Sequence, residues 1–196
     1  IPDALAGRDV CGKAKTGSGK TLAFGIPLVV RSTQGRPRRP HALVLAPTRE
    51  LAAQIESELR PLAALRKQTV ASFYGGVGFG KQLTALRNGV DIVVACPGRL
   101  EDLMKQGHCR LDQVQVTVLD EADHMSDMGF LPGVKRILDR TPAGGQRMLF
   151  SATLDNDVKV IVDRYLNQPV THALDPVDSP VEEMTHHLVE TSQTEK

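Results

Sequence analysis

A glycine-rich segment near the start of the chain constrains the fold more than any other feature of the sequence. Residues 9–13 form a short, partly apolar run that can make a buried strand, and residues 22–30 are mostly apolar and can continue a helix. A strand, a glycine-rich turn and a helix start, in this order, are typical of a loop that binds phosphate groups. The residues of this loop are Ala14, Lys15, Thr16, Gly17, Ser18, Gly19, Lys20 and Thr21.

The loop sequence predicts which groups would contact a nucleotide. Gly17 and Gly19 allow a tight turn with inward-pointing N–H groups, and the helix start adds the positive end of its dipole. Lys20 can reach the β- and γ-phosphates, and the hydroxyl of Thr21 can bind Mg²⁺. The first glycine of the general pattern is replaced by Ala14. From this segment alone, a glycine turn without a ligand stays open as an alternative.

Composition limits the class of protein. A length of 196 residues suits one domain, and a formal net charge of +1 means that any nucleic-acid site must be a local patch. The three cysteines, Cys11, Cys96 and Cys109, lack metal-binding spacing and favour a reducing compartment such as the cytoplasm over a disulfide scaffold. No apolar run is long enough to cross a bilayer, so we expect no membrane attachment.

Apolar runs alternate with helical patterns along most of the chain. Strands are expected at residues 41–46, 68–74, 91–95, 114–119 and 148–150, and helices at residues 50–65, 81–87, 97–105 and 155–165. This alternation predicts an α/β domain with a mostly parallel central sheet covered by helices on both faces. Ligands of such sheets bind beyond the carboxyl ends of the strands, where the polar motifs of this chain fall.

An acidic segment follows the apolar strand expected at residues 114–119. Asp120 can hold Mg²⁺ opposite Thr21, and Glu121 can act as the base that polarises the attacking water. An acidic pair after a strand is usually only a turn, but the phosphate loop upstream favours the functional interpretation. We therefore expect Lys20, Asp120 and Glu121 to be the catalytic residues.

Residues 120–123 carry the four-letter signature of the DEAD-box RNA helicases, and nearly the whole chain resembles this family. The other family signatures occur in order at residues 14–21, 47–52, 75–76, 97–99 and 151–153. The resemblance implies a three-layer RecA-like P-loop domain, ATP hydrolysis with Mg²⁺ and remodelling of RNA duplexes. It also implies that the strand before Ser151 lies between the phosphate-loop strand and the strand before Asp120. Residues 47–52 argue against another P-loop enzyme, such as a DNA helicase or a transporter ATPase.

The resemblance also implies an RNA-binding surface. Backbone N–H groups at glycines and helix starts, together with arginines, suit phosphates and give little sequence preference. Other interpretations stay open: Arg49 could pair with a nearby carboxylate, the two glycines could form a plain turn, and Pro97 could simply start a helix. The expected RNA-binding residues are Pro47, Thr48, Arg49, Gly75, Gly76, Pro97, Gly98 and Arg99.

Ser151 and Thr153 resemble the motif that couples hydrolysis to strand separation in the family. Their hydroxyls could hydrogen-bond Asp123, although such a pair after a strand is more often a helix cap. Two positions depart from the family pattern: Cys96 stands where Thr is usual, and Lys15 stands where Gln is common. Cys96 lacks the strong hydroxyl donor, which puts its contact with RNA in doubt.

The family pattern also predicts the domain organisation. Residues 1–174 would form the N-terminal RecA-like domain, and residues 175–196 a linker and the start of a C-terminal RecA-like domain, with a lone strand at residues 184–189. The adenine-reading Gln motif would precede Ile1, and the arginine finger would belong to the second domain. We expect this chain to be monomeric and inactive or very weak as a helicase. The alternative is an isolated nucleotide- and RNA-binding module without turnover.

A separate basic segment lies at residues 32–40, where Arg36, Arg38 and Arg39 alternate with glycine and proline. The composition is typical of a solvated loop. An auxiliary contact with RNA phosphates is the alternative.

Overall fold

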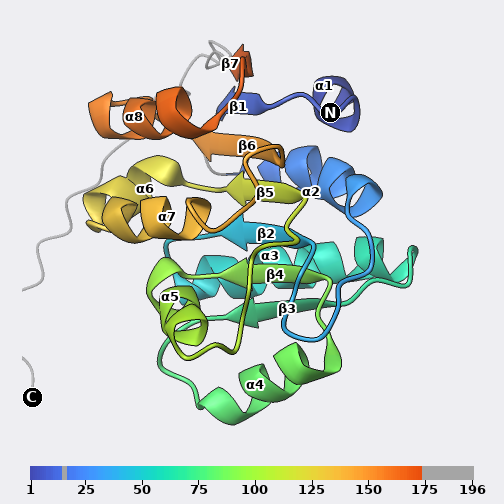
Figure 1. Cartoon of the computed structure of the whole chain (residues 1–196). Helices are drawn as coiled ribbons and strands as arrows, with labels where there is room; N and C mark the ends of the chain where they lie inside the picture. The colour runs from blue at the N-terminus through green and yellow to red at the C-terminus, as the bar shows by residue number, and fades with distance from the viewer. Residues whose placement is uncertain (15–16, 174–196) are drawn as a thin grey trace, which may run out of the picture.

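Seven strands form one sheet at the centre of the described chain (Figure 1). The computed structural model describes residues 1–14 and 17–173, so the strand expected at residues 184–189 lies outside it. The strands are β1 (Val10–Lys13), β2 (Ala42–Leu45), β3 (Val70–Phe73), β4 (Ile92–Ala95), β5 (Val116–Leu119), β6 (Gln146–Ser151) and β7 (Val170–Ala173). Their order is β3-β4-β2-β5-β6-β1-β7, and all neighbouring strands run parallel. The expected parallel α/β fold is confirmed.

The position of β6 decides which loops meet. This strand pairs with β1, where Gly12 lies beside Phe150, and with β5, where Val118 lies beside Met148. The neighbour relationship implied by the family resemblance is thereby confirmed. Because parallel strands end at the same edge, the segments that follow β1, β5 and β6 converge there.

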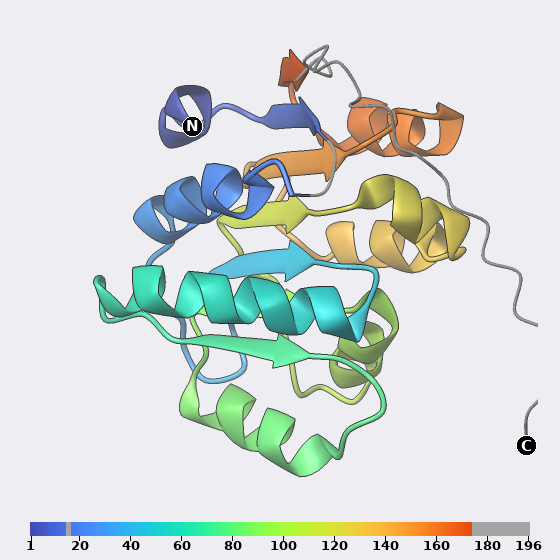
Figure 2. The same cartoon turned by 180° about the vertical axis from the view of Figure 1, so that it is seen from behind.

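Helices cover both faces of the sheet and make the fold three-layered. Helices α2 and α3 lie on the face seen in Figure 2, whereas α5, α6, α7 and α8 lie on the face toward the viewer in Figure 1. The helices are α1 (Pro2–Leu5), α2 (Lys20–Arg31), α3 (Arg49–Ala64), α4 (Phe79–Asn88), α5 (Pro97–Lys105), α6 (Ala122–Asp127), α7 (Leu131–Leu138) and α8 (Asn156–Tyr165).

Alternation along the strands builds two cores, one under each helical layer. In β2, Leu43 and Leu45 belong to the core beneath α5 to α8, whereas Val44 belongs to the core beneath α2 and α3. Successive side chains of a strand point to opposite faces, so an unbroken apolar run supplies both cores. All three side chains are fully buried.

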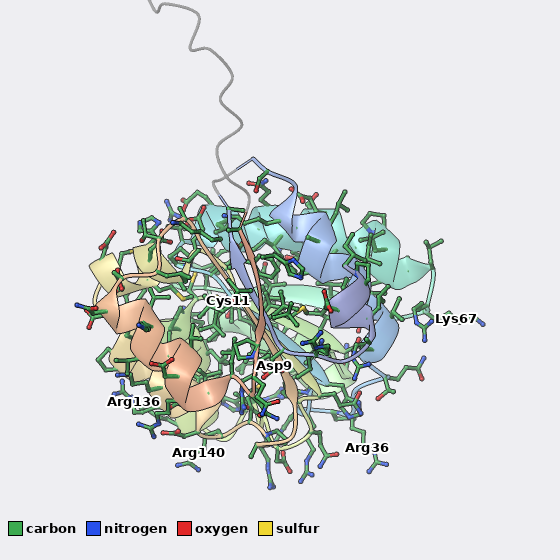
Figure 3. The ribbon with its side chains drawn as sticks, turned by 90° about the horizontal axis from the view of Figure 1, so that it is seen from above. Asp9, Cys11, Arg36, Lys67, Arg136 and Arg140 are labelled. Carbon is green, nitrogen blue, oxygen red and sulfur yellow. The ribbon has the colours of Figure 1, made fainter. Side chains whose placement is uncertain are left out.

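Four elements go beyond those expected from the sequence: α1, α6, α7 and β7. Helix α7 contains Pro132 and Gly133, which hide its apolar face from a pattern search. Strand β7 is largely exposed, and contacts with residues far away in the sequence hold it beside β1. The buried carboxylate of Asp9 accepts hydrogen bonds from the N–H groups of Arg147 and Asn167, both at 2.7 Å, and so holds the segment before β7 (Figure 3).

Two findings bear on the environment of the chain. All three cysteines are free thiols, with Cys11 and Cys109 buried. Within residues 1–14 and 17–173, no helix combines the length and apolar character needed to cross a membrane.

Candidate functional site

The phosphate loop joins β1 to α2 at the carboxyl edge of the sheet. Gly17 and Gly19 have φ angles of 81° and 79°, a left-handed backbone that favours glycine. Gly19 is the N-cap of α2, so the first N–H groups of this helix point toward the loop. The expected ATP-binding residues Lys15 and Thr16 lie outside the described residues.

The side chains of Lys20 and Asp120 lie close together beside this loop. The Lys20 ammonium donates to the carbonyl of Ala14 at 3.0 Å and lies 4.0 Å from Oδ1 of Asp120. Lys20 is 8% exposed and Asp120 2% exposed. The structure therefore brings together a cation and a carboxylate that are far apart in the sequence, in a largely water-excluded place.

The buried position of Asp120 changes its chemistry. Burial raises the pKa of its carboxyl to about 6, the nearby Lys20 ammonium opposes the rise, and the charges of Glu121 and Asp123 add to it. Among the described residues, no three His, Cys, Asp or Glu side chains gather as a metal site. One carboxylate beside a phosphate loop nevertheless fits Mg²⁺, which is usually bound by one or two carboxylates together with substrate phosphates and water.

Glu121 has an unusual backbone. Its φ and ψ angles are 51° and 54°, a left-handed conformation that disfavours residues with a side chain. Its N–H donates to Oδ1 of Asp120 at 3.0 Å, and its carboxylate lies 3.5 Å from Nδ1 of His124. Strained backbone of this kind is concentrated at functional sites.

A cavity of about 210 Å³ lies between the phosphate loop and the acidic segment. Its lining includes Lys20 and Glu121, two of the expected catalytic residues. A second space, of about 160 Å³, adjoins the loop and is lined by Phe150 and His172, among others. Neither of these two side chains could be identified from the sequence, because β6 and β7 reach the loop only through the strand order. A larger cavity, about 710 Å³, lies at the amino ends of the strands and contains none of the expected site residues.

Asp123 joins the acidic segment to the end of β6. Its Oδ2 accepts hydrogen bonds from the N–H groups of Ala152 and Thr153 at 3.1 and 3.0 Å and from the Thr153 hydroxyl at 3.3 Å. Its own N–H donates to Oγ of Ser151 at 3.0 Å. The N-cap of the next helix is Asp155, so Ser151 and Thr153 are not the helix cap considered as an alternative.

The first part of the expected RNA-binding surface lies at the start of α3. Thr48 is its N-cap, and its side chain accepts a hydrogen bond from the N–H of Leu51 at 3.2 Å. Arg49 pairs with the neighbouring carboxylate of Glu50 at 2.5 Å, as the alternative interpretation allowed. Gly76 has a φ of 80°, and a Cβ atom there would lie 3.4 Å from a guanidinium nitrogen of Arg49. The two motifs are therefore neighbours in space.

Arg99, at the start of α5, holds the loop between β3 and α4. Its guanidinium donates to Oε1 of Gln82 at 2.9 Å and to the carbonyl of Val77 at 3.3 and 3.4 Å, and lies 4.1 Å from the centre of the Phe79 ring. The sequence identified Arg99 but none of these partners. Arg99 thus orders the segment that follows Gly75 and Gly76.

The second part of this surface begins α5. Pro97 stands in the first turn of this helix and Cys96 is its N-cap, without a side-chain capping bond. Burial, followed by the charge of Glu50, raises the pKa of the Cys96 thiol to about 11. The thiol is therefore neutral and a weaker donor than the hydroxyl expected at this position.

A parallel sheet with a glycine loop after β1, an acidic segment after β5 and β6 between them defines a RecA-like P-loop domain of the nucleotide-binding class. The comparison with protein families is more specific. The DEAD/DEAH box helicase model matches residues 1–161, and the chain belongs to this family.

Individual relatives agree with this assignment. The chain is 47% identical over 176 residues to DEAD-box ATP-dependent RNA helicase 9, mitochondrial, of Arabidopsis thaliana, covering 87% of this chain and 28% of that protein. It is 42% identical to ATP-dependent RNA helicase RhlB of Erwinia tasmaniensis, covering 100% of this chain and 47% of the relative. The chain thus spans less than half the length of either relative.

Solved structures share the fold. A DEAD box protein from Methanococcus jannaschii superposes with a TM-score of 0.82 at 35% identity, over 88% of this chain and 47% of that one. A hypothetical ATP-dependent RNA helicase from Sulfolobus tokodaii gives a TM-score of 0.81 at 37% identity, over 89% of this chain and 50% of that one.

Proposed function

We propose that this chain is the ATP-binding domain of a DEAD-box RNA helicase that couples Mg²⁺-dependent ATP hydrolysis to RNA binding and local duplex unwinding. The observation that carries the proposal is the position of the acidic segment. Its first carboxylate, Asp120, is buried beside Lys20, and its last, Asp123, is bonded to the end of β6. One short segment thereby contacts both Lys20 of the phosphate loop and the residues after β6.

The chemical roles follow from this geometry. Lys20 would neutralise the β- and γ-phosphates, and Glu121 would take the proton from the attacking water. Asp120 and the hydroxyl of Thr21 would hold Mg²⁺, which supplies charge neutralisation to the phosphates when bound. The cavity of about 210 Å³, lined by Lys20 and Glu121, leaves room for the reacting phosphate.

RNA would bind along the carboxyl edge of the sheet. The helix starts at Thr48 and Pro97 present backbone N–H groups, and Gly76 allows close approach next to Arg49. Contacts of this type read the phosphate backbone and not the bases. The expected binding is therefore without a sequence motif.

We further propose that residues 1–174 are the N-terminal of two RecA-like domains and that residues 175–196 lead into the second. Relatives that are much longer than this chain support this organisation. The second domain would supply the arginine finger, which is worth about 10³–10⁵ in rate in related NTPases. Free cysteines are compatible with a reducing compartment such as the cytoplasm.

The test compares this chain with a longer form that contains both domains. ATP turnover is measured without nucleic acid, with RNA and with DNA of the same sequence, and strand displacement is measured on a short RNA duplex. The longer form should show RNA-stimulated turnover and unwinding, and this chain should show neither. Stimulation by DNA alone would contradict the proposal. Turnover absent from both forms, with ATP and RNA bound, would favour the binding-module alternative.

A further inference from the structure

The basic segment at residues 32–40 forms a rigid turn. Arg36 and Arg39 form an isolated antiparallel bridge, and the N–H of Gly35 donates to Oδ1 of Asp91 at 2.5 Å. The N–H of Arg38 donates to the carbonyl of Leu86 at 2.7 Å. Arg38 has a φ of 61°, a conformation that arginine adopts only where its surroundings impose it. The backbone of the turn is therefore held by hydrogen bonds, and the segment is not a loose loop.

The side chains of two of these arginines have no partner within the part of the chain that the structure describes. The guanidinium groups of Arg36 and Arg38 are exposed and make no hydrogen bond or ion pair there. Arg39 pairs with Asp112 at 3.0 Å, and Arg110 approaches the same carboxylate oxygen at 3.5 Å. One carboxylate thus serves two arginines, which leaves this surface with an excess of positive charge.

The turn adjoins a cleft of about 460 Å³ between α5 and α7. Arg110 and Asp112 belong to its lining, and the N–H of Arg110 donates to the carbonyl of Arg38 at 2.8 Å. Glu101, also in the lining, is held by two hydrogen bonds from Arg136 at 2.6 and 3.1 Å. We call the following residues the basic face: Arg36, Arg38, Arg39, Lys105, Arg110 and Arg140.

Two members of the basic face lie on the same side of the molecule. Figure 3 shows Arg36 and Arg140 at the lower edge of the view, with side chains directed outward. Cations at helix ends often only complement the helix dipole, which accounts for Lys105 at the end of α5. That explanation does not apply to Arg36 and Arg38, because the turn that carries them is not a helix end.

We propose that the basic face binds the phosphate backbone of RNA that flanks the strand held at the carboxyl edge, an inference that rests on the RNA binding proposed above. Guanidinium groups bind phosphates through paired hydrogen bonds. Helix α5 connects the two surfaces, since it begins at Pro97 and ends at Lys105. Nine helical residues span about 13 Å. A strand held at the carboxyl edge must therefore extend by several nucleotides to reach the basic face.

The length dependence of RNA binding tests this inference. Fluorescence anisotropy at several salt concentrations would measure the affinity of this chain for labelled single-stranded RNAs of about 6 and 16 nucleotides. The double variant Arg36→Ala/Arg140→Ala should bind the longer RNA on the order of tenfold more weakly, and its salt slope should fall by about 1.4 for two lost phosphate contacts. Binding of the shorter RNA should not change.

A matched control removes two exposed cations elsewhere, Arg66→Ala/Lys159→Ala, and should leave both RNAs unaffected. Equal affinity of Arg36→Ala/Arg140→Ala and the unchanged chain for the longer RNA would overturn the inference, as would an equal loss in the control. Displacement of the longer RNA by polyglutamate at equal charge would assign this face to an acidic peptide instead. Failure of the unchanged chain to bind the shorter RNA would overturn the proposed function itself.

Discussion

The carboxylate of Asp123 holds Thr153 by two hydrogen bonds, from its backbone N–H at 3.0 Å and from its hydroxyl at 3.3 Å, across thirty residues of sequence. Burial raises the pKa of the Asp123 carboxyl, but hydrogen bonds from Ser151, Thr153 and His124 outweigh burial and hold the pKa below its usual value. Asp123 is therefore ionised at neutral pH, and its carboxylate links the acidic segment to the residues after β6.

The hydroxyl of Thr153 is expected to matter for unwinding more than for hydrolysis. In a form with both domains, Thr153→Val removes one hydrogen bond to Asp123 and keeps the backbone N–H donor. RNA-stimulated ATP turnover should persist while displacement of a short RNA duplex falls. Thr153→Ser, which keeps the hydroxyl, serves as the control. Equal unwinding by the valine and serine variants would show that the hydroxyl contact with Asp123 does not contribute to coupling.

Lys20→Ala should abolish detectable ATP binding in a form that binds ATP, because no other described side chain places a cation between Ala14 and Asp120. Titration calorimetry measures the affinity, and circular dichroism checks the fold. The pKa of Asp120 should rise further above 6, since the Lys20 ammonium opposes the rise in the unchanged protein. Unchanged ATP affinity would remove the phosphate-loop assignment.

Asp120→Asn should make the domain more stable while removing its metal-binding carboxylate. The folded pKa of Asp120, about 6, exceeds the usual aspartate value of 3.8, so the ionised side chain weakens the folded state at higher pH. The gain should be absent below about pH 4, grow as the pH rises to 6 and reach on the order of 1–3 kcal/mol at pH 8. Urea unfolding of both proteins without nucleotide or Mg²⁺ measures it. A less stable asparagine variant at pH 8 would show that Lys20 dominates this site.

We expect the Glu121 carboxylate to be needed for catalysis and the Glu121 backbone conformation to lower the stability of the domain. In a two-domain form, Glu121→Gln should keep ATP and RNA binding and lose about 10²–10⁴ in turnover. Glu121→Gly should also be inactive but more stable by about 1 kcal/mol, because glycine adopts the φ of 51° without strain. Steady-state kinetics and thermal unfolding measure the two effects. A turnover of Glu121→Gln within about twofold of the unchanged protein would reassign the base.

Arg99 is expected to act on RNA binding partly through the loop that it holds. Arg99→Ala removes its bonds to Gln82 and Val77 and its contact with Phe79, which should destabilise the domain by about 1–2 kcal/mol. RNA affinity should fall about equally for all RNA sequences. Arg99→Lys, which keeps the charge but not the planar fork, should give an intermediate result. A loss confined to one RNA sequence would contradict backbone recognition.

The expected strands and the glycine-rich loop were confirmed where a short stretch of consecutive residues predicts them. The apolar runs that became β2, β4 and β5 predict buried strands from four to six consecutive residues, and the loop before Lys20 is a contiguous pattern. Helix α7 and strand β7 could not be found in this way. In α7, Pro132 and Gly133 interrupt the helical sequence pattern. Strand β7 depends on Asp9, whose side chain accepts a hydrogen bond from Asn167, 158 residues away.

The sequence by itself determined that the chain forms a parallel α/β sheet and which residues are expected to carry the chemistry, because short patterns and the family signatures predict both. Only the tertiary structure decided which side chains meet. Arg99 binds the loop after β3, Asp123 binds the residues after β6, and Asp120 is buried enough to shift its pKa to about 6. These contacts depend on strand order and on packing between distant segments, and burial sets the strength of each charge. A short sequence pattern shows neither the strand order nor the burial of a side chain.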